Sequence, residues 1–163
     1  MDRELLKAIN AAYRRLQMKA SQLSLALSHK IFESESGWYN GHYHKDDAGN
    51  WCVESYPIYV ININKLCDIE IQFDRISVST KMKRDAALAY SFEKFTDYEF
   101  EAYGVDDYLA DFYHAKQTVE ELKENIRACD EVEIGFSFTF PFEIEVEQIL
   151  EFVQLLRHEN FYY

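Results

Sequence analysis

The chain has 163 residues, of which 29 are acidic and 17 basic, and its formal net charge is −12. Such acidity opposes binding to a phosphate backbone or to anionic lipid, so we expect neither a nucleic-acid nor a membrane partner. The length predicts one domain over residues 1–163, and the aromatic content of 16% is typical of a packed globule rather than a disordered chain.

Three features favour a cytoplasmic protein. No apolar run approaches the roughly 18 residues that a membrane helix needs. The first ten residues lack the apolar core of a secretory signal. The cysteines, Cys52, Cys67 and Cys129, are odd in number and far apart, which fits reduced thiols better than a disulfide framework.

Residues 2–28 are predicted to form a long amphipathic helix. Apolar side chains recur at spacings of three and four, as one face of a helix requires: Leu5, Ile9, Ala12, Leu16, Ala20, Leu23 and Leu27. Residues 1–30 carry six basic and two acidic side chains, whereas residues 91–163 carry five basic and eighteen acidic ones. A helix of about 40 Å exceeds what a compact domain of this size needs, which favours a homodimer interface. Its basic side chains could dock on the acidic half of the same chain or of a second copy.

The middle of the chain is predicted to form antiparallel strands. Residues 33–37 break the helical pattern and are expected to be a loop. A hairpin follows, with strands over 38–44 and 51–56 and a turn at 46–49. Further strands complete a meander at 58–63, 67–73 and 76–79. The first of these three is apolar on both faces and is expected to lie centrally.

The next part alternates between helices and one short strand. Helices are predicted over 83–95, 106–114 and 118–128, and a strand over 97–104. Thr118 and Glu121 have the spacing of a capping box at the start of the third helix.

A strict alternation marks the last strand. From Val132 to Val146 every even position is apolar, which places these side chains on one face. Pro141 cannot donate to a ladder, so the strand is expected to end there, and a final helix begins near Val146. The predicted fold is α+β, with an antiparallel sheet of about five to six strands packed against a long N-terminal helix and a C-terminal helix.

The first candidate metal site lies on the predicted hairpin. His42 and His44 are alternate residues of a strand, so both imidazoles point to one face, and a turn centred on Asp47 places His42 opposite Cys52. These ligands would suit zinc. The competing interpretation is a half-exposed hairpin held by cross-strand aromatic contacts.

The second candidate site lies on the predicted helix 106–114. Asp107, Asp111 and His114 have the i, i+4, i+7 spacing of one helical face, where two carboxylates and an imidazole could bind a divalent cation or move a proton. The competing interpretation is a solvated acidic face.

The tyrosines and tryptophans are candidates for contact with a ligand or partner, because their rings can be buried while a polar atom stays at the surface. Those singled out are Trp38, Tyr43, Trp51, Tyr103 and Tyr108. No Gly-x-Ser-x-Gly or glycine-rich phosphate loop occurs, so no catalytic residue is assigned and no cofactor is expected. The sequence favours a binding or regulatory module acting on a protein or small ligand. The alternative is a metal-binding protein or a hydrolase-type enzyme that uses one of the two clusters.

Overall fold

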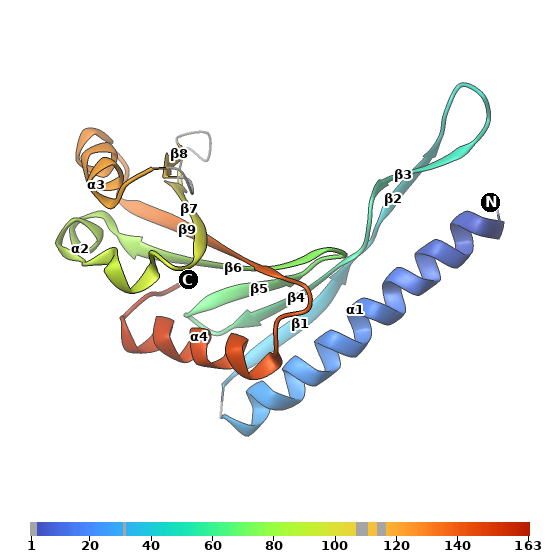
Figure 1. Cartoon of the computed structure of the whole chain (residues 1–163), viewed down its shortest axis with the longest axis horizontal. Coiled ribbons are helices and arrows are strands. Elements are labelled where there is room, and N and C mark those ends of the chain that lie inside the picture. The colour runs from blue at the N-terminus through green and yellow to red at the C-terminus, as the bar shows by residue number, and fades with distance from the viewer. Residues whose placement is uncertain (1–2, 31, 107–110, 114–116) are drawn as a thin grey trace.

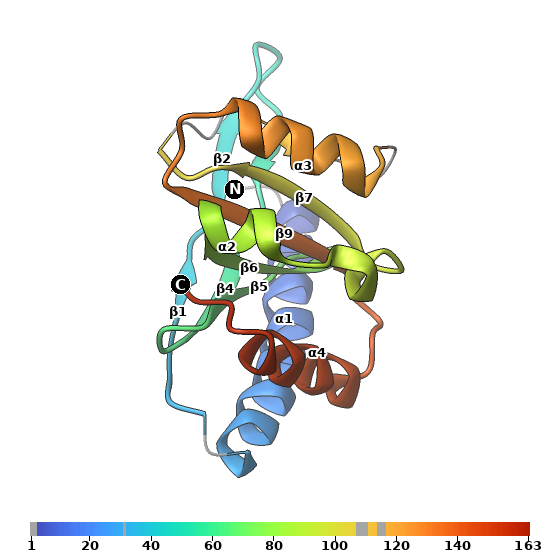
Figure 2. The same ribbon diagram turned by 90° about the vertical axis from the view of Figure 1, so that its left-hand side faces the viewer.

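The computed structural model describes residues 3–30, 32–106, 111–113 and 117–163. It confirms the predicted α+β class, with an antiparallel sheet packed against a long N-terminal helix, α1 (Arg3–His29), and a C-terminal helix, α4 (Val146–His158). α1 and α4 lie side by side beneath the sheet (Figures 1 and 2). None of the described helices is both long and apolar enough to span a bilayer.

The main sheet contains seven strands within the described residues, and every pairing is antiparallel. Their spatial order is β1 (Ser34–Tyr39), β4 (Ile58–Ile63), β5 (Cys67–Ile71), β6 (Arg75–Lys83), β9 (Glu133–Pro141), β7 (Glu99–Gly104) and β8 (Asp111–Tyr113). The last three strands of the predicted meander are confirmed as β4, β5 and β6, although β4 lies next to the edge rather than at the centre, and the hairpin strands form a separate sheet. β9 enters between β6 and β7, and it ends at Pro141 as predicted.

The edge strand β1 corrects one prediction. Residues 33–37 are not a loop, because Ser34 to Gly37 belong to β1 and pair with β4. All six residues of β1 are exposed, so the strand needs no apolar alternation and leaves no pattern to detect.

A second, two-stranded sheet projects from the main one as an arm (Figure 1). The arm consists of β2 (His42–Lys45) and β3 (Trp51–Ser55), and a turn closes it in which Asp46 Oδ1 accepts the backbone N–H groups of Ala48 and Asn50. The predicted strand over 38–44 is interrupted at Gly41. An added Cβ there would lie 2.3 Å from the Tyr43 hydroxyl, so only glycine leaves room for that side chain.

Two helical predictions are also corrected. The helix expected over 83–95 divides into α2 (Arg84–Ala89) and a 3-10 helix, η1 (Phe92–Phe95). Residues three apart share one side of a 3-10 helix, so η1 buries both Phe92 and Phe95. The helix expected over 106–114 is wrong for residues 111–113, which form β8 against β7.

The last two helices begin as predicted. In α3 (Val119–Ala128), the Thr118 hydroxyl accepts the backbone N–H of Glu121 at 3.2 Å. α4 begins at Val146, where Glu145 and Gln148 form a reciprocal capping box.

The core lies between one face of the sheet and the helices. The even-numbered side chains of β9 all point into it, as their alternation predicts: Ile134, Phe136, Phe138 and Phe140. The ring of Phe138 lies 4.8 Å from Phe152 of α4 and 5.3 Å from Phe95 of η1, measured between ring centroids. Buried residues of α1, α2 and α3 join the same core.

The opposite face of the sheet is called the open face below. Within the described part of the chain, no helix packs on it (Figures 1 and 2). Small residues form its middle, because β6 contributes Ser77 and Ser79 while β9 contributes Gly135, Ser137 and Thr139. The open face is therefore where polar side chains of the neighbouring strands can meet.

Candidate functional site

The pairing register aligns the polar residues of the open face in rows across the strands. One row contains Glu35, Asn62, Asp68, Ser79, Ser137 and Glu101. The next row contains Gly37, Val60, Glu70, Ser77, Thr139 and Glu99. Carboxylates thus lie on both sides of a strip of small hydroxyl side chains.

Two carboxylates of β5 form one side of this strip. Asn62 donates its side-chain N–H to Asp68 at 2.6 Å, and Gln72 donates to Glu70 at 3.2 Å. Partial burial raises the pKa of the Glu70 carboxyl, and the nearby Asp68 carboxylate raises this pKa further. Two negative charges are therefore held close together, with neutral amides as their neighbours.

Tyr103 of β7 reaches over the strip from the other side. Its ring lies on Gly135, where an added Cβ would be 2.4 Å from Tyr103 Cε2. Burial raises the pKa of the Tyr103 hydroxyl, and the charges of Glu70 and Asp68 raise it further. The hydroxyl therefore stays protonated at neutral pH.

The C-terminal tail completes the cluster. The backbone of Tyr162 pairs with Lys81 of β6, beyond the point where β5 ends. This pairing carries Tyr163 to the open face, where burial and a hydrogen bond to Asp68 raise the pKa of its hydroxyl. The ammonium of Lys81 lies 5.0 Å from the centroid of the Tyr163 ring.

We call Asp68, Glu70, Tyr103 and Tyr163 the acid–tyrosine cluster. They come from β5, β7 and the tail, so β6 and β9 lie between them. Carboxylates accept hydrogen bonds, protonated phenols donate or accept them, and aromatic faces attract cations. This combination suits the recognition of a cationic group.

The predicted aromatic contact residues do not form one site. Trp38 lies at the base of the arm, where its ring centroid is 5.1 Å from Tyr13 and 4.9 Å from Tyr59. The Tyr43 hydroxyl is buried nearby without a hydrogen-bond partner among the described residues. Trp51 lies further along the arm, with the Lys45 ammonium 5.3 Å from its ring. β1 and β7 are five strand spacings apart, about 24 Å, which separates Trp38 from Tyr103.

The first predicted metal cluster is not assembled. The register places His44, not His42, opposite Cys52, and a bulge between His42 and Tyr43 shifts His42 to face Ser55. The Cys52 thiol lies 3.9 Å from Asp46. Among the described residues, no group of three or more His, Cys, Asp or Glu side chains could hold a metal ion.

The second predicted cluster falls mostly outside the described residues. Asp107 and His114 lie there, and so does the candidate contact residue Tyr108. The backbone of Asp111 is described, and it pairs with Tyr103 in a strand rather than lying on a helical face.

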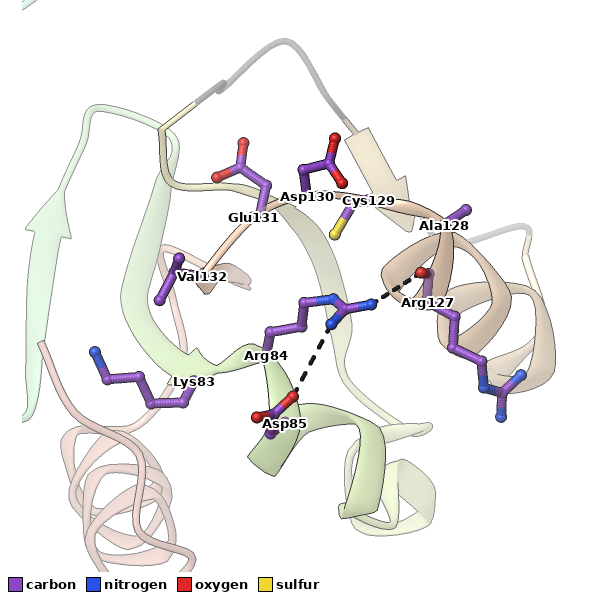
Figure 3. Close-up of a pocket in the computed structure, with 9 residues that line it drawn as sticks. All are labelled: Lys83, Arg84, Asp85, Arg127, Ala128, Cys129, Asp130, Glu131 and Val132. Carbon is purple, nitrogen blue, oxygen red and sulfur yellow. Dashed lines mark hydrogen bonds and ion pairs between the residues drawn. The ribbon is translucent and has the colours of Figure 1, made fainter.

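A separate pocket of about 550 Å³ lies where α2 and α3 meet (Figure 3). Arg84 crosses it and donates to the carbonyl oxygens of Ile126 and Arg127 at 3.1 and 2.9 Å. The Cys129 thiol donates to Ile126 at 3.0 Å. Arg84 thus caps the end of α3. We therefore interpret the pocket as part of the junction between two helices rather than as a binding site.

Comparisons with known proteins show the architecture. No family model matches the sequence, and no curated protein matches it. A solved structure, that of a conserved hypothetical protein from Pyrococcus furiosus, is similar, with a TM-score of 0.67 and 21% identity, covering 95% of this chain and 98% of the other. At this identity the likeness shows the fold alone.

Sequence reasoning missed three of the four members of the acid–tyrosine cluster. Asp68 and Glu70 do occupy the non-core positions of an alternating strand, which is the signal available in the sequence. Their meeting with Tyr103 depends on β9 entering between β6 and β7, and no local pattern encodes that order.

Proposed function

We propose that this protein is a cytoplasmic binding module whose open face takes up a cationic segment of a partner protein. The observation that carries the proposal is the convergence of the acid–tyrosine cluster on a sheet face that none of the described helices covers. Three thiols free of disulfide bonds support the compartment.

The chemistry of the open face favours arginine or lysine side chains as ligands. Charge-assisted hydrogen bonds to carboxylates are roughly twice as strong as neutral ones, and arginine can bind a carboxylate through two N–H groups. Within this chain, the Lys81 ammonium already lies near the Tyr163 ring, which shows a cation next to one member of the cluster.

The dimensions favour an extended segment over a single ion. Glu35 on β1 and Glu101 on β7 lie on the same row, five strand spacings apart, which is about 24 Å. About seven residues of extended chain span that distance. Both glutamates are exposed at the ends of this row.

A labelled nona-arginine peptide tests the proposal through fluorescence anisotropy. We expect the wild-type protein to bind it, and Asp68→Asn combined with Glu70→Gln to weaken binding about tenfold, since each ion pair at a partly exposed position contributes up to about 1 kcal/mol. The matched control is Glu147→Gln with Glu151→Gln on α4, which changes the net charge equally at exposed positions.

Two results would overturn the proposal. The first is an absence of peptide binding to the wild-type chain at low ionic strength. The second is an equal loss in both double variants, because that would show attraction to the total charge rather than to the open face.

A further inference from the structure

The outer edge of β1 presents unpaired backbone groups. β1 is the terminal strand of the sheet, and among the described residues no strand pairs with its outer side. All six of its side chains are exposed. Sheet edges of this kind readily pair with another strand, and natural edges are usually protected by charged side chains, proline, bulges or extreme shortness. β1 has no proline and no bulge, it is six residues long, and its single charged side chain is Glu35.

The ladder to β4 determines which groups point outward. The backbone N–H of Asn64 donates to the carbonyl oxygen of Glu33 at 2.9 Å, so residue 33 belongs to a hydrogen-bonded pair. In an antiparallel ladder such pairs alternate, so residues 35, 37 and 39 also face β4. The N–H and C=O groups of Ser34, Ser36 and Trp38 therefore point away from the sheet.

The sequence of β1 is self-complementary in the antiparallel direction. When two copies are centred on Ser36, each Ser34 lies opposite Trp38 of the other copy, and the two Ser36 residues face each other. These are the residues with outward backbone groups, so they would exchange six hydrogen bonds across the new ladder. The pair has closed two-fold symmetry, so no further copies can be added through this edge.

Charge also fits this register. Glu35 is the only charged residue of β1, and it lies opposite Gly37 of the other copy rather than opposite a second carboxylate. Gly37 leaves space there, since an added Cβ would meet nothing within 4 Å, and it lines a hollow of about 400 Å³ together with Tyr39 and Val60. The Glu35 side chain of the second copy would occupy that hollow.

We propose that two copies of this chain pair through β1 and join their seven-stranded sheets into one. Side chains directly opposite in an antiparallel pair lie on the same face, so the two open faces would lie on the same side of the joined sheet. This inference stands independently of the ligand assigned to the open face.

Sedimentation equilibrium of the full chain tests the proposal. We expect a dimer for the wild type. Gly37→Glu places a carboxylate opposite Glu35 twice per dimer and should weaken association about fivefold to tenfold. Gly37→Lys should strengthen association by a similar factor. Ser36→Pro removes an outward N–H without breaking the ladder to β4, and it should give a monomer.

The control is Ser21→Glu, which adds the same charge on exposed helix α1, and circular dichroism confirms folding of every variant. A wild-type chain that is monomeric at all accessible concentrations would overturn the inference. A dimer that weakens equally with Gly37→Glu and Ser21→Glu would place the interface elsewhere. Opposite shifts from the two Gly37 variants support pairing through β1, because a general loss of stability cannot produce both.

Discussion

Replacing Lys123 by methionine removes the charged donor that holds the end of α2. The ammonium of Lys123 donates to the carbonyl oxygens of Ala87 at 2.9 Å and Leu88 at 2.7 Å, and also to that of Tyr90. The last carbonyls of a helix have no partner within the helix, so they need a donor from elsewhere. Arg84 of α2 in turn donates to the last carbonyl oxygens of α3, so each helix supplies the donor that caps the end of the other.

The expected loss in the free energy of unfolding follows from those three contacts. A hydrogen bond to a charged group contributes about 1.5–3 kcal/mol, but Lys123 is only half-buried and water can replace part of what is lost. We therefore expect Lys123→Met to lower the free energy of unfolding by about 2–3 kcal/mol. For a chain of this size, that corresponds to a decrease in Tm of roughly 5–10 °C.

Urea unfolding followed by circular dichroism measures the effect. Lys7→Met is the matched control, because Lys7 is exposed and pairs with Glu4 at 3.4 Å; its loss should lower the free energy of unfolding by under about 0.5 kcal/mol. If the free energy of unfolding of Lys123→Met lies within about 0.5 kcal/mol of the wild-type value, water satisfies the last carbonyl groups of α2 and Lys123 does not cap this helix.

Two further predictions concern the open face and the core. Since burial raises the pKa of Glu70, the folded state holds its proton more tightly than the unfolded state, and the resulting stability is lost as pH rises through the raised pKa. Glu70→Gln should therefore raise Tm at pH 7 but not at pH 3, and an equal gain at both would contradict this cause. Phe138 is 1% exposed, so Phe138→Ala should lower the free energy of unfolding in urea by about 3–5 kcal/mol, whereas Phe138→Leu should cost about 1.5 kcal/mol. Similar costs for both would show that the core refills the space left by the ring.

Elements with a repeating apolar pattern could be predicted from the sequence. α1 keeps one apolar stripe over 27 residues, and β9 alternates without a fault, so both were found nearly to the residue. In each case burial of one face forces the pattern, because a polar residue at a core position would lack a hydrogen-bond partner.

Elements that depend on contacts with distant parts of the chain, rather than on their own apolar pattern, could not be predicted. β1 reads Ser-Glu-Ser-Gly-Trp-Tyr and is a strand because β4 supplies its ladder, not because its residues favour one. The break between α2 and η1 likewise depends on Lys123, which lies more than thirty residues further along the chain. The predicted hairpin register was wrong because the turn is centred on Ala48 rather than on Asp47, which places His44 opposite Cys52; the bulge then moves His42 one position further, to Ser55.

The β6–β9 ladder also has a consequence for synthesis of the chain. It joins Arg75 to Pro141 and Lys83 to Glu133, so β6 emerges from the ribosome 50 to 66 residues before its partner. At about 5–20 residues per second, that interval lasts roughly 3–13 s. During this time the edge of β6 that later binds β9 has no partner strand, and the apolar face of the meander lacks α4, which follows β9 in the chain. The sheet is thus completed only after β9 has emerged, and the nascent meander is the stage that exposes most apolar surface to a chaperone.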